Sequence, residues 1–197
     1  MTSQTQIGKL ALQHIGDRYD ISDLSEASVE AEQINLVYED VRKEVMRRHP
    51  WNFATKFASP ATLSVTVPGN WDNAYAYPSD ALRIIEIVNP LGRNLPTLDF
   101  EIGLLSDDTK VILTDEDNAE FRYTADISDP TRFDSEFTMA FSFMLASRVA
   151  MPLTGDGGIK RLLMQEAEGL ILQAGATDAN EGRTEEPPEA SWITARI

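Results

Sequence analysis

The chain has 197 residues, 42% of them hydrophobic, and a formal net charge of -15. A chain of this length favours one core with an embellishment over two equal domains. It contains no cysteine and only two histidines, His14 and His49, so we expect no disulfide, no thiol nucleophile, no metal site and no cofactor.

Negative charge is concentrated between residues 99 and 136, where twelve acids and three bases give a net charge of -9. Such a surface repels phosphate, which disfavours a sequence-reading DNA-binding protein and suits one that lets DNA pass without binding it. No run approaches the roughly 20 apolar residues that cross a bilayer, and the first residues lack the features of an export signal. We therefore expect folding in a cytosol and no membrane partner.

Two amphipathic helices are predicted at the start of the chain. The first is expected over residues 3–15, with Gly16 placed to end it, and apolar side chains recur on one face. The second is expected over residues 28–48, and Pro50 stops it.

The helical period disappears between residues 53 and 126, where short runs with β propensity alternate with turn-forming segments. The expected strands cover residues 61–67, 82–88, 110–114 and 119–125. This pattern favours an antiparallel sheet or a small sandwich. The polar residues 113–119 predict a hairpin that joins the last two strands.

Two further helices are predicted over residues 134–150, where Pro152 closes the first, and over residues 158–174. Helix pairs joined by short loops pack as antiparallel neighbours. The predicted fold is therefore α+β. An antiparallel bundle of about four helices (1–52 and 128–177) carries an inserted antiparallel β-rich region (53–127) and an extended C-terminal arm (178–197).

An aromatic corner follows the second helix. Pro50 breaks the helix, and Trp51 and Phe53 can fill the seam where the bundle meets the sheet, because aromatic side chains bury a large area. The alternative interpretation of these residues is an aromatic site that binds a ligand.

Tyrosine alternates with alanine around Tyr75 and Tyr77. This alternation suits a strand with large side chains on one face and small side chains on the other. A structural role is favoured here. The alternative is that the two tyrosines face a neighbouring subunit, since tyrosine is enriched in interface cores.

Paired carboxylates are the candidates for catalysis, because a glycosidase needs two acids about 5 to 10 Å apart. They occur at 107–108, at 115–117, and at Asp134 with Glu136. They lie in hydrophilic turns, where carboxylates stay solvated, so catalysis is disfavoured. The glycine-rich residues 155–158 lack the Gly-Lys-Ser/Thr of a phosphate loop and predict a tight turn between helices.

The polar C-terminal arm ends with apolar side chains at Trp192, Ile193 and Ile197. A hydrophilic tether that carries such side chains favours docking onto a partner, by strand addition or in a groove. Packing back onto its own domain is the alternative.

The order of these segments resembles the head-to-tail adaptor family of tailed bacteriophages, often called tail tubular protein A in short-tailed phages. The likeness covers about residues 5 to 182 and depends on order and spacing rather than on any single motif. Its segments are residues 10–16, 47–54, 77–83 and 153–156, the last followed by a helix with Glu166 and Glu168.

The resemblance implies a structural virion protein and not an enzyme. Such adaptors form a ring, commonly a dodecamer, beneath the portal protein in the neck of the virion, and the ring passes double-stranded DNA to the tail without sequence-specific binding. The implied partners are the portal protein, a tail or nozzle protein and further copies of this chain, assembled in the bacterial host cytoplasm. The arm 178–197 would reach the portal or a neighbouring subunit. The candidates for an acidic lumen are Asp107, Asp108, Asp115, Glu116 and Asp117.

The sequence leaves two other classes of function open. One is a tail-associated enzyme that degrades polysaccharide with paired carboxylates. The other is an interaction or assembly-chaperone module that never enters the virion.

Overall fold

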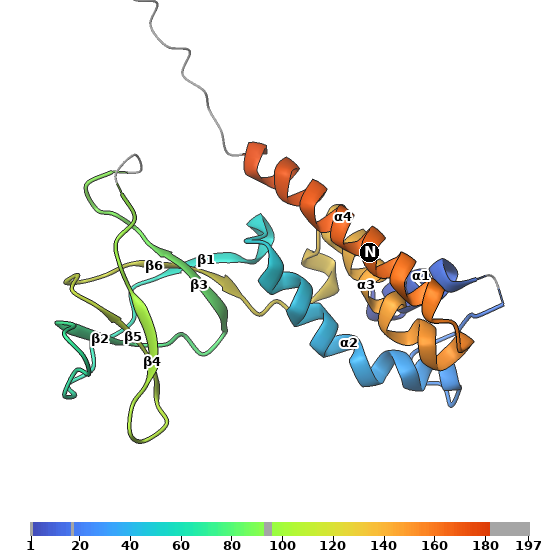
Figure 1. Cartoon of the computed structure of the whole chain (residues 1–197), viewed down its shortest axis with the longest axis horizontal. Helices are drawn as coiled ribbons and strands as arrows, with labels where there is room; N and C mark the ends of the chain where they lie inside the picture. The colour runs from blue at the N-terminus through green and yellow to red at the C-terminus, as the bar shows by residue number, and fades with distance from the viewer. Residues whose placement is uncertain (1, 17, 93–95, 182–197) are drawn as a thin grey trace, which may run out of the picture.

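The structure is a computed structural model that describes residues 2–16, 18–92 and 96–181. Helices gather at one end of the molecule and strands at the other (Figure 1). Four helices form a bundle, and two small antiparallel sheets are inserted between the second helix and the third. The α+β fold predicted from the sequence is therefore confirmed.

The first two helices begin at serine caps. α1 spans Gln4–Ile15 and α2 spans Val29–Arg48. The hydroxyl groups of Ser3 and Ser28 accept hydrogen bonds from main-chain N–H groups in the first turns, which otherwise have no partner within the helix. Each helix buries one apolar stripe, as its residue spacing predicts.

The third helix is the centre of the bundle. α3 spans Ser135–Thr154, and α1, α2 and α4 (Gly157–Glu181) all pack against it. It is long and apolar enough, by length and composition alone, to cross a membrane, although no such run was expected from the sequence; more than half of that stretch is buried inside the protein. Its apolar side chains are explained by the three helices that cover it.

The predicted end of α3 is wrong, because the helix continues through Pro152 to Thr154. Pro152 lies in the last turn and has no N–H to donate to the carbonyl of Arg148, and the helix ends two residues after it. The hydroxyl group of Thr154 donates to the carbonyl of Ala150 at 2.8 Å, and Gly155 closes the helix in the left-handed conformation at φ 73°.

Six short strands form the two sheets. One sheet has the order β1-β6-β3, and its strands are Thr55–Ala58 (β1), Phe121–Ala125 (β6) and Ala81–Ile87 (β3). The other has the order β2-β5-β4, with strands Asn73–Ala76 (β2), Lys110–Thr114 (β5) and Glu101–Leu104 (β4). All pairs are antiparallel.

The predicted hairpin between residues 110–114 and 119–125 is wrong. β5 pairs with β2 and β4, whereas β6 pairs with β1 and β3, so the connection at 115–120 carries the chain from one sheet to the other. Asn118 has a positive φ of 54°, which lets this connection turn sharply. The hairpin that does form joins β4 to β5.

The predicted strand over residues 61–67 is also wrong. This segment runs beside β2 through main-chain hydrogen bonds from Leu63 to Ala74 and from Ala76 to Ala61, but its only bridge in the described chain joins Thr62 to Tyr75. The segment therefore forms an irregular and largely exposed flank of the sheet rather than a strand.

The main hydrophobic core runs continuously from the helical bundle into the β1-β6-β3 sheet. The second sheet has a smaller core of its own around Ala74, Val111 and Leu113. Figure 1 shows the strands extending away from the bundle to one side. The inserted β-rich part is therefore anchored in the bundle at its near end and has separate packing at its far end.

Candidate functional site

The acids proposed for a lumen lie in two turns of the β-rich part. Asp107 and Asp108 are exposed in the turn between β4 and β5, where Asp108 has a positive φ of 63°. Hydrogen bonds from Thr109 hold the pKa of Asp107 below its usual value. Asp115, Glu116 and Asp117 begin the connection from β5 to β6, and Glu116 is half-buried. Both groups are turn carboxylates, as the sequence predicts.

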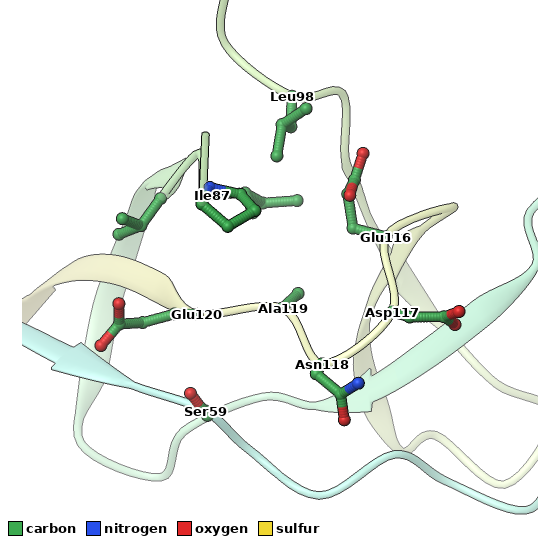
Figure 2. A pocket seen from close by; sticks show the side chains of 10 residues that line it. Ser59, Ile87, Leu98, Glu116, Asp117, Asn118, Ala119 and Glu120 are labelled. Carbon is green, nitrogen blue, oxygen red and sulfur yellow. The ribbon is translucent and has the colours of Figure 1, made fainter. Parts of the chain in front are cut away.

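A pocket of about 420 Å³ lies beside the β5–β6 connection. Apolar side chains, including Ile87, Leu98 and Ala119, form much of its lining (Figure 2). Figure 2 shows the carboxylates of Asp117 and Glu120 pointing in different directions. Hydrolysis of a sugar needs two carboxyl groups that face one bond, and these carboxylates do not converge in that way.

The tyrosine pair divides into two different environments. Tyr75 is 1% exposed, and its hydroxyl group donates to the carbonyl of Glu116 at 2.8 Å and accepts from the N–H of Ala119 at 3.2 Å. The interface alternative for Tyr75 is therefore wrong, because its ring and hydroxyl group are used within the chain. Tyr77 is half-buried, and the ammonium of Lys110 lies 3.5 Å from its ring centroid.

Asp80 joins three strands of the β1-β6-β3 sheet. Its carboxylate accepts hydrogen bonds from the ammonium of Lys56 at 2.6 Å and from the hydroxyl group of Tyr123 at 3.1 Å. The hydrogen bond from Lys56 is the largest cause of a lowered pKa at Asp80. The residue therefore has a structural role at the start of β3.

The aromatic corner lies where the bundle meets the sheet, as predicted. Trp51 is 1% exposed and donates its indole N–H to the carbonyl of Val45 at 3.1 Å. The ring of Trp51 meets the ring of Phe137 of α3 edge-on at a centroid distance of 5.1 Å. The ring of Phe53 also meets the ring of Phe137, at a centroid distance of 5.0 Å. The corner after Pro50 is thus a packed plug and leaves no open aromatic site at these rings.

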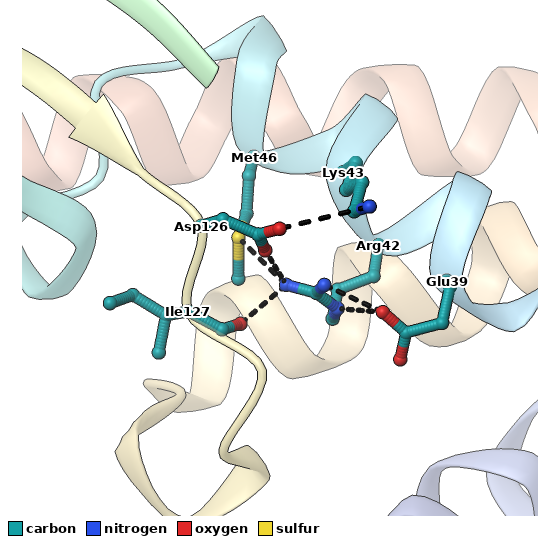
Figure 3. A network of polar contacts seen from close by, with 6 residues as sticks. All are labelled: Glu39, Arg42, Lys43, Met46, Asp126 and Ile127. Carbon is teal, nitrogen blue, oxygen red and sulfur yellow. Dashed lines mark hydrogen bonds and ion pairs between the residues drawn. The ribbon is translucent and has the colours of Figure 1, made fainter. Parts of the chain in front are cut away.

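An ion-pair network fixes the other side of this seam. The side chain of Arg42 is 1% exposed, and its guanidinium lies beside the chain that leaves β6 (Figure 3). It donates to Asp126 at 2.5 Å, to the carbonyl of Ile127 at 2.6 Å and to Glu39 at 2.6 Å. Lys43 adds a longer contact of 3.7 Å to Asp126.

Burial alone would lower the pKa of Arg42, but the hydrogen bonds that Arg42 donates to Asp126 and Glu39 outweigh it and raise that pKa. Arg42 therefore stays charged inside the protein, where a buried cation is stable only with such partners. Nearby, Arg83 of β3 donates to the main-chain carbonyl of Arg47 at 3.1 Å. The contacts of Arg42, Arg83 and Trp51 thus connect the end of α2 to the sheet and to α3.

A second network links three helices. Glu44 of α2 accepts hydrogen bonds from Arg48 at 2.7 Å and from Arg148 of α3 at 2.6 Å, and Arg48 also reaches Glu168 of α4 at 3.4 Å. Burial raises the pKa of Glu44, but the two arginines outweigh it and hold that pKa below its usual value. These residues keep the bundle in register beside the seam.

Large apolar side chains exposed to solvent were not singled out by the sequence patterns. They occur on helices and on strands, and the most exposed of them in the described chain are Leu91, Leu172, Leu36, Leu104, Val29, Leu162 and Phe57. On a helix, such a side chain could have been found in the sequence as an apolar residue that lies outside the helix's apolar stripe. Such side chains, where they gather, mark surfaces that contact other molecules.

The two histidines have structural surroundings. The imidazole of His14 stacks on Phe143 at 3.7 Å and hydrogen-bonds Ser142 at 3.0 Å, and burial lowers its pKa. His49 packs against Trp51. Among the residues that the structure describes, no three potential ligands come together to hold a metal ion.

The predicted docking residues Trp192, Ile193 and Ile197 lie outside the described residues. The proposed start of the C-terminal arm at residue 178 needs correction, because α4 continues to Glu181. Nothing in residues 176–181 breaks a helix, since they include two alanines and neither proline nor glycine.

No protein-family model matches this chain, and no curated protein matches it at a significant level.

Proposed function

We propose that this protein is a head-to-tail adaptor of a tailed bacteriophage. Copies of it form a ring, commonly a dodecamer in such adaptors, beneath the portal protein in the neck of the virion, after assembly in the host cytoplasm. The ring joins the portal to the tail or nozzle protein and surrounds the passage for double-stranded DNA. Its work is mechanical, and it makes or breaks no covalent bond.

The observation that carries the proposal is the packed and hydrogen-bonded connection between two differently built parts. A ring subunit between a portal and a tail has to keep its two ends in fixed relation while DNA moves through it. The plug at Trp51 and the buried network at Arg42 connect the bundle to the β-rich part in this way. Both arise from residues distant in sequence, so bending at the seam would break several contacts together.

The charge of the β-rich part supports a conduit. The turns at 107–108 and 115–117 carry five carboxylates, mostly exposed. If they face the passage, DNA slides past them, because a surface without lysine and arginine does not release counterions from DNA. In this arrangement the β-rich part meets the tail component, and the residues after α4 reach the portal or a neighbouring subunit.

Attachment to the portal would gain strength from repetition. A docking segment of modest affinity holds firmly when many copies engage one ring, since each later contact forms within a complex that already exists. The sequence near Trp192 supplies the apolar side chains for such a segment.

The proposal is tested by mixing the purified chain with its portal protein and imaging the mixture by electron microscopy. We expect an added ring on one face of the portal. A matched variant that ends at Glu181 should lose most of this binding while its helices stay folded by circular dichroism. Portals that remain bare with the full chain at high concentration would contradict the proposal.

A further inference from the structure

The β1-β6-β3 sheet runs from the seam with the bundle to the pocket beside the β5–β6 connection. At the seam, β1 and β3 begin and β6 ends, next to the last turn of α2. At the opposite ends of the same strands, the adjoining residues line the pocket, and they are Ser59, Val88 and Glu120. A segment that leaves the bundle at the seam therefore reaches the pocket by following this sheet.

The pocket combines apolar walls with acidic sides. Figure 2 shows Ile87, Leu98 and Ala119 around the hollow, with Glu116 on one side and Glu120 on the other. Among the residues that the structure describes, the lining holds no lysine or arginine, and neither glutamate carboxylate has a hydrogen bond or an ion pair. The pocket therefore suits a segment with large apolar side chains and a positive charge.

The sequence after α4 carries its charges in two blocks. Residues 182–189 contain three glutamates and one arginine. Residues 190–197, here called the tip, contain Arg196 and no acid, together with the large apolar residues Trp192, Ile193 and Ile197. The tip thus has the chemistry that the pocket lacks, and the block before it has the opposite charge.

The last turns of α4 lie beside the seam. A Cβ atom at Gly175 would lie 3.0 Å from Nδ1 of His49, the residue that follows α2. Figure 1 shows this end of α4 on the side of the bundle from which the strands extend. Two bases at the seam, Arg47 and Arg83, make no side-chain ion pair with any residue that the structure describes. The acidic block therefore starts close to two bases that it can pair with.

The spacing of the two blocks fits the length of the sheet. Arg83 and Val88 are five residues apart on and just beyond β3, which is about 17 Å of strand. Glu186 and Trp192 are six residues apart, and an extended chain of that length spans about 20 Å. One extended segment can therefore place its acids at the seam and its tryptophan at the pocket.

We infer that in the free subunit the tip binds in the pocket of its own chain, with Trp192 against the apolar walls and Arg196 beside Glu116. The short tether between α4 and the tip raises the local concentration of the tip at this pocket, which favours the chain's own tip over that of another copy. A tip bound in this way is not free to dock elsewhere. The portal protein then has to compete for it.

This inference adds regulation to the proposed adaptor function, and it rests on that proposal for its biological meaning. Its test needs no portal protein, so the two can fail separately. If the tip binds the pocket while portals stay bare, only the adaptor function is wrong. If portals gain rings while the tip does not bind the pocket, only this inference is wrong.

The test uses the absence of cysteine from the natural chain, which lets two spin labels be placed at chosen positions. The full chain with Ser59→Cys and Ala195→Cys carries one label at the pocket and one in the tip. The matched control combines Ser106→Cys, in the exposed turn at the other end of β5, with Ala195→Cys. Pulsed electron paramagnetic resonance should give one short, narrow distance for the 59–195 pair and a longer distance for the control.

Two outcomes of this measurement would overturn the inference. One is a broad 59–195 distribution that extends toward the roughly 50 Å that sixteen extended residues can span. The other is a short distance that disappears when unlabelled protein is added in excess, because the tip would then occupy the pocket of another copy.

A charge reversal provides the second measurement. Glu116→Lys with Glu120→Lys should reduce the narrow 59–195 population severalfold, and adding Arg196→Glu should restore it. Glu32→Lys with Asp40→Lys, the same change of charge at exposed positions on α2, should leave it unchanged. An unchanged distance in the pocket variant, or no recovery with Arg196→Glu, would show that the tip is not held by these acids and would contradict the inference.

Discussion

Arg42 of α2 and Asp126 beyond β6 are 84 residues apart in the sequence, yet the guanidinium donates a hydrogen bond of 2.5 Å to the carboxylate. The same guanidinium nitrogen also donates to the carbonyl of Ile127. The pair fixes the point where the chain leaves the sheet and turns toward α3. It is therefore a structural joint between the two parts of the molecule.

We predict that Asp126→Ala lowers the free energy of unfolding by about 3 kcal/mol, because it leaves a buried guanidinium short of one charged partner. Urea unfolding followed by tryptophan fluorescence measures the change. Lys43→Ala is the control: its contact with Asp126 is 3.7 Å long and partly exposed, so its loss should cost less than about 1 kcal/mol. Similar losses in the two variants would show that Arg42 is not the centre of this joint.

Trp51→Ala should lower the free energy of unfolding by about 4 kcal/mol, since it removes the largest fully buried side chain at the seam. Trp51→Phe should cost less, because it keeps the contact with Phe137 and loses the hydrogen bond to Val45. Thermal unfolding by circular dichroism compares the two variants. A small effect of the alanine variant would contradict a packed plug.

Tyr38→Phe should leave stability within about 0.5 kcal/mol of the wild type or raise it. The hydroxyl group of Tyr38 is buried and has no hydrogen-bond partner among the described residues, and burial raises its pKa. Tyr75→Phe is the matched control and should cost about 1 to 3 kcal/mol, because Glu116 and Ala119 lose their partner. Denaturant unfolding of both variants decides between these outcomes, and a clear loss in Tyr38→Phe would indicate a hidden partner for its hydroxyl group.

Glu44 gives the protein a dependence on pH. Its pKa in the folded chain is held below the ordinary value of 4.5, so its stabilising effect is complete above about pH 4.5 and is lost as the pH falls through the lower folded value. Glu44→Gln should therefore lower the melting temperature at pH 7 and flatten its dependence on pH below 4.5. Glu166→Gln, at an exposed position on α4, should leave the slope unchanged. Parallel slopes for wild type and Glu44→Gln would refute this assignment.

The sequence predicted the elements whose signals are local and repeated. α1 and α2 were predicted within a residue or two because apolar side chains recur on one face of each, and Gly16 and Pro50 mark where they end. β5 was placed with its observed bounds, Lys110–Thr114, since a polar turn flanks a short apolar run on each side. The corner at Trp51 was also predicted, because proline and two aromatic residues leave few other arrangements.

Partner choice between strands could not be predicted in the same way. The turn at 115–118 has hairpin chemistry, but the hydroxyl group of Tyr75 holds the connection at Glu116 and Ala119, and β6 pairs in the other sheet. β1 and β4 were missed because each has only four residues, of which β1 exposes two and β4 exposes three. The joint at Arg42 was missed because its partners lie far apart in the chain.

Quantitative mass spectrometry of purified virions is the measurement that tests the adaptor function most directly. The proposal predicts that this chain is present in an amount close to that of the portal protein. Virions that contain the portal protein and carry no detectable amount of this chain would contradict it.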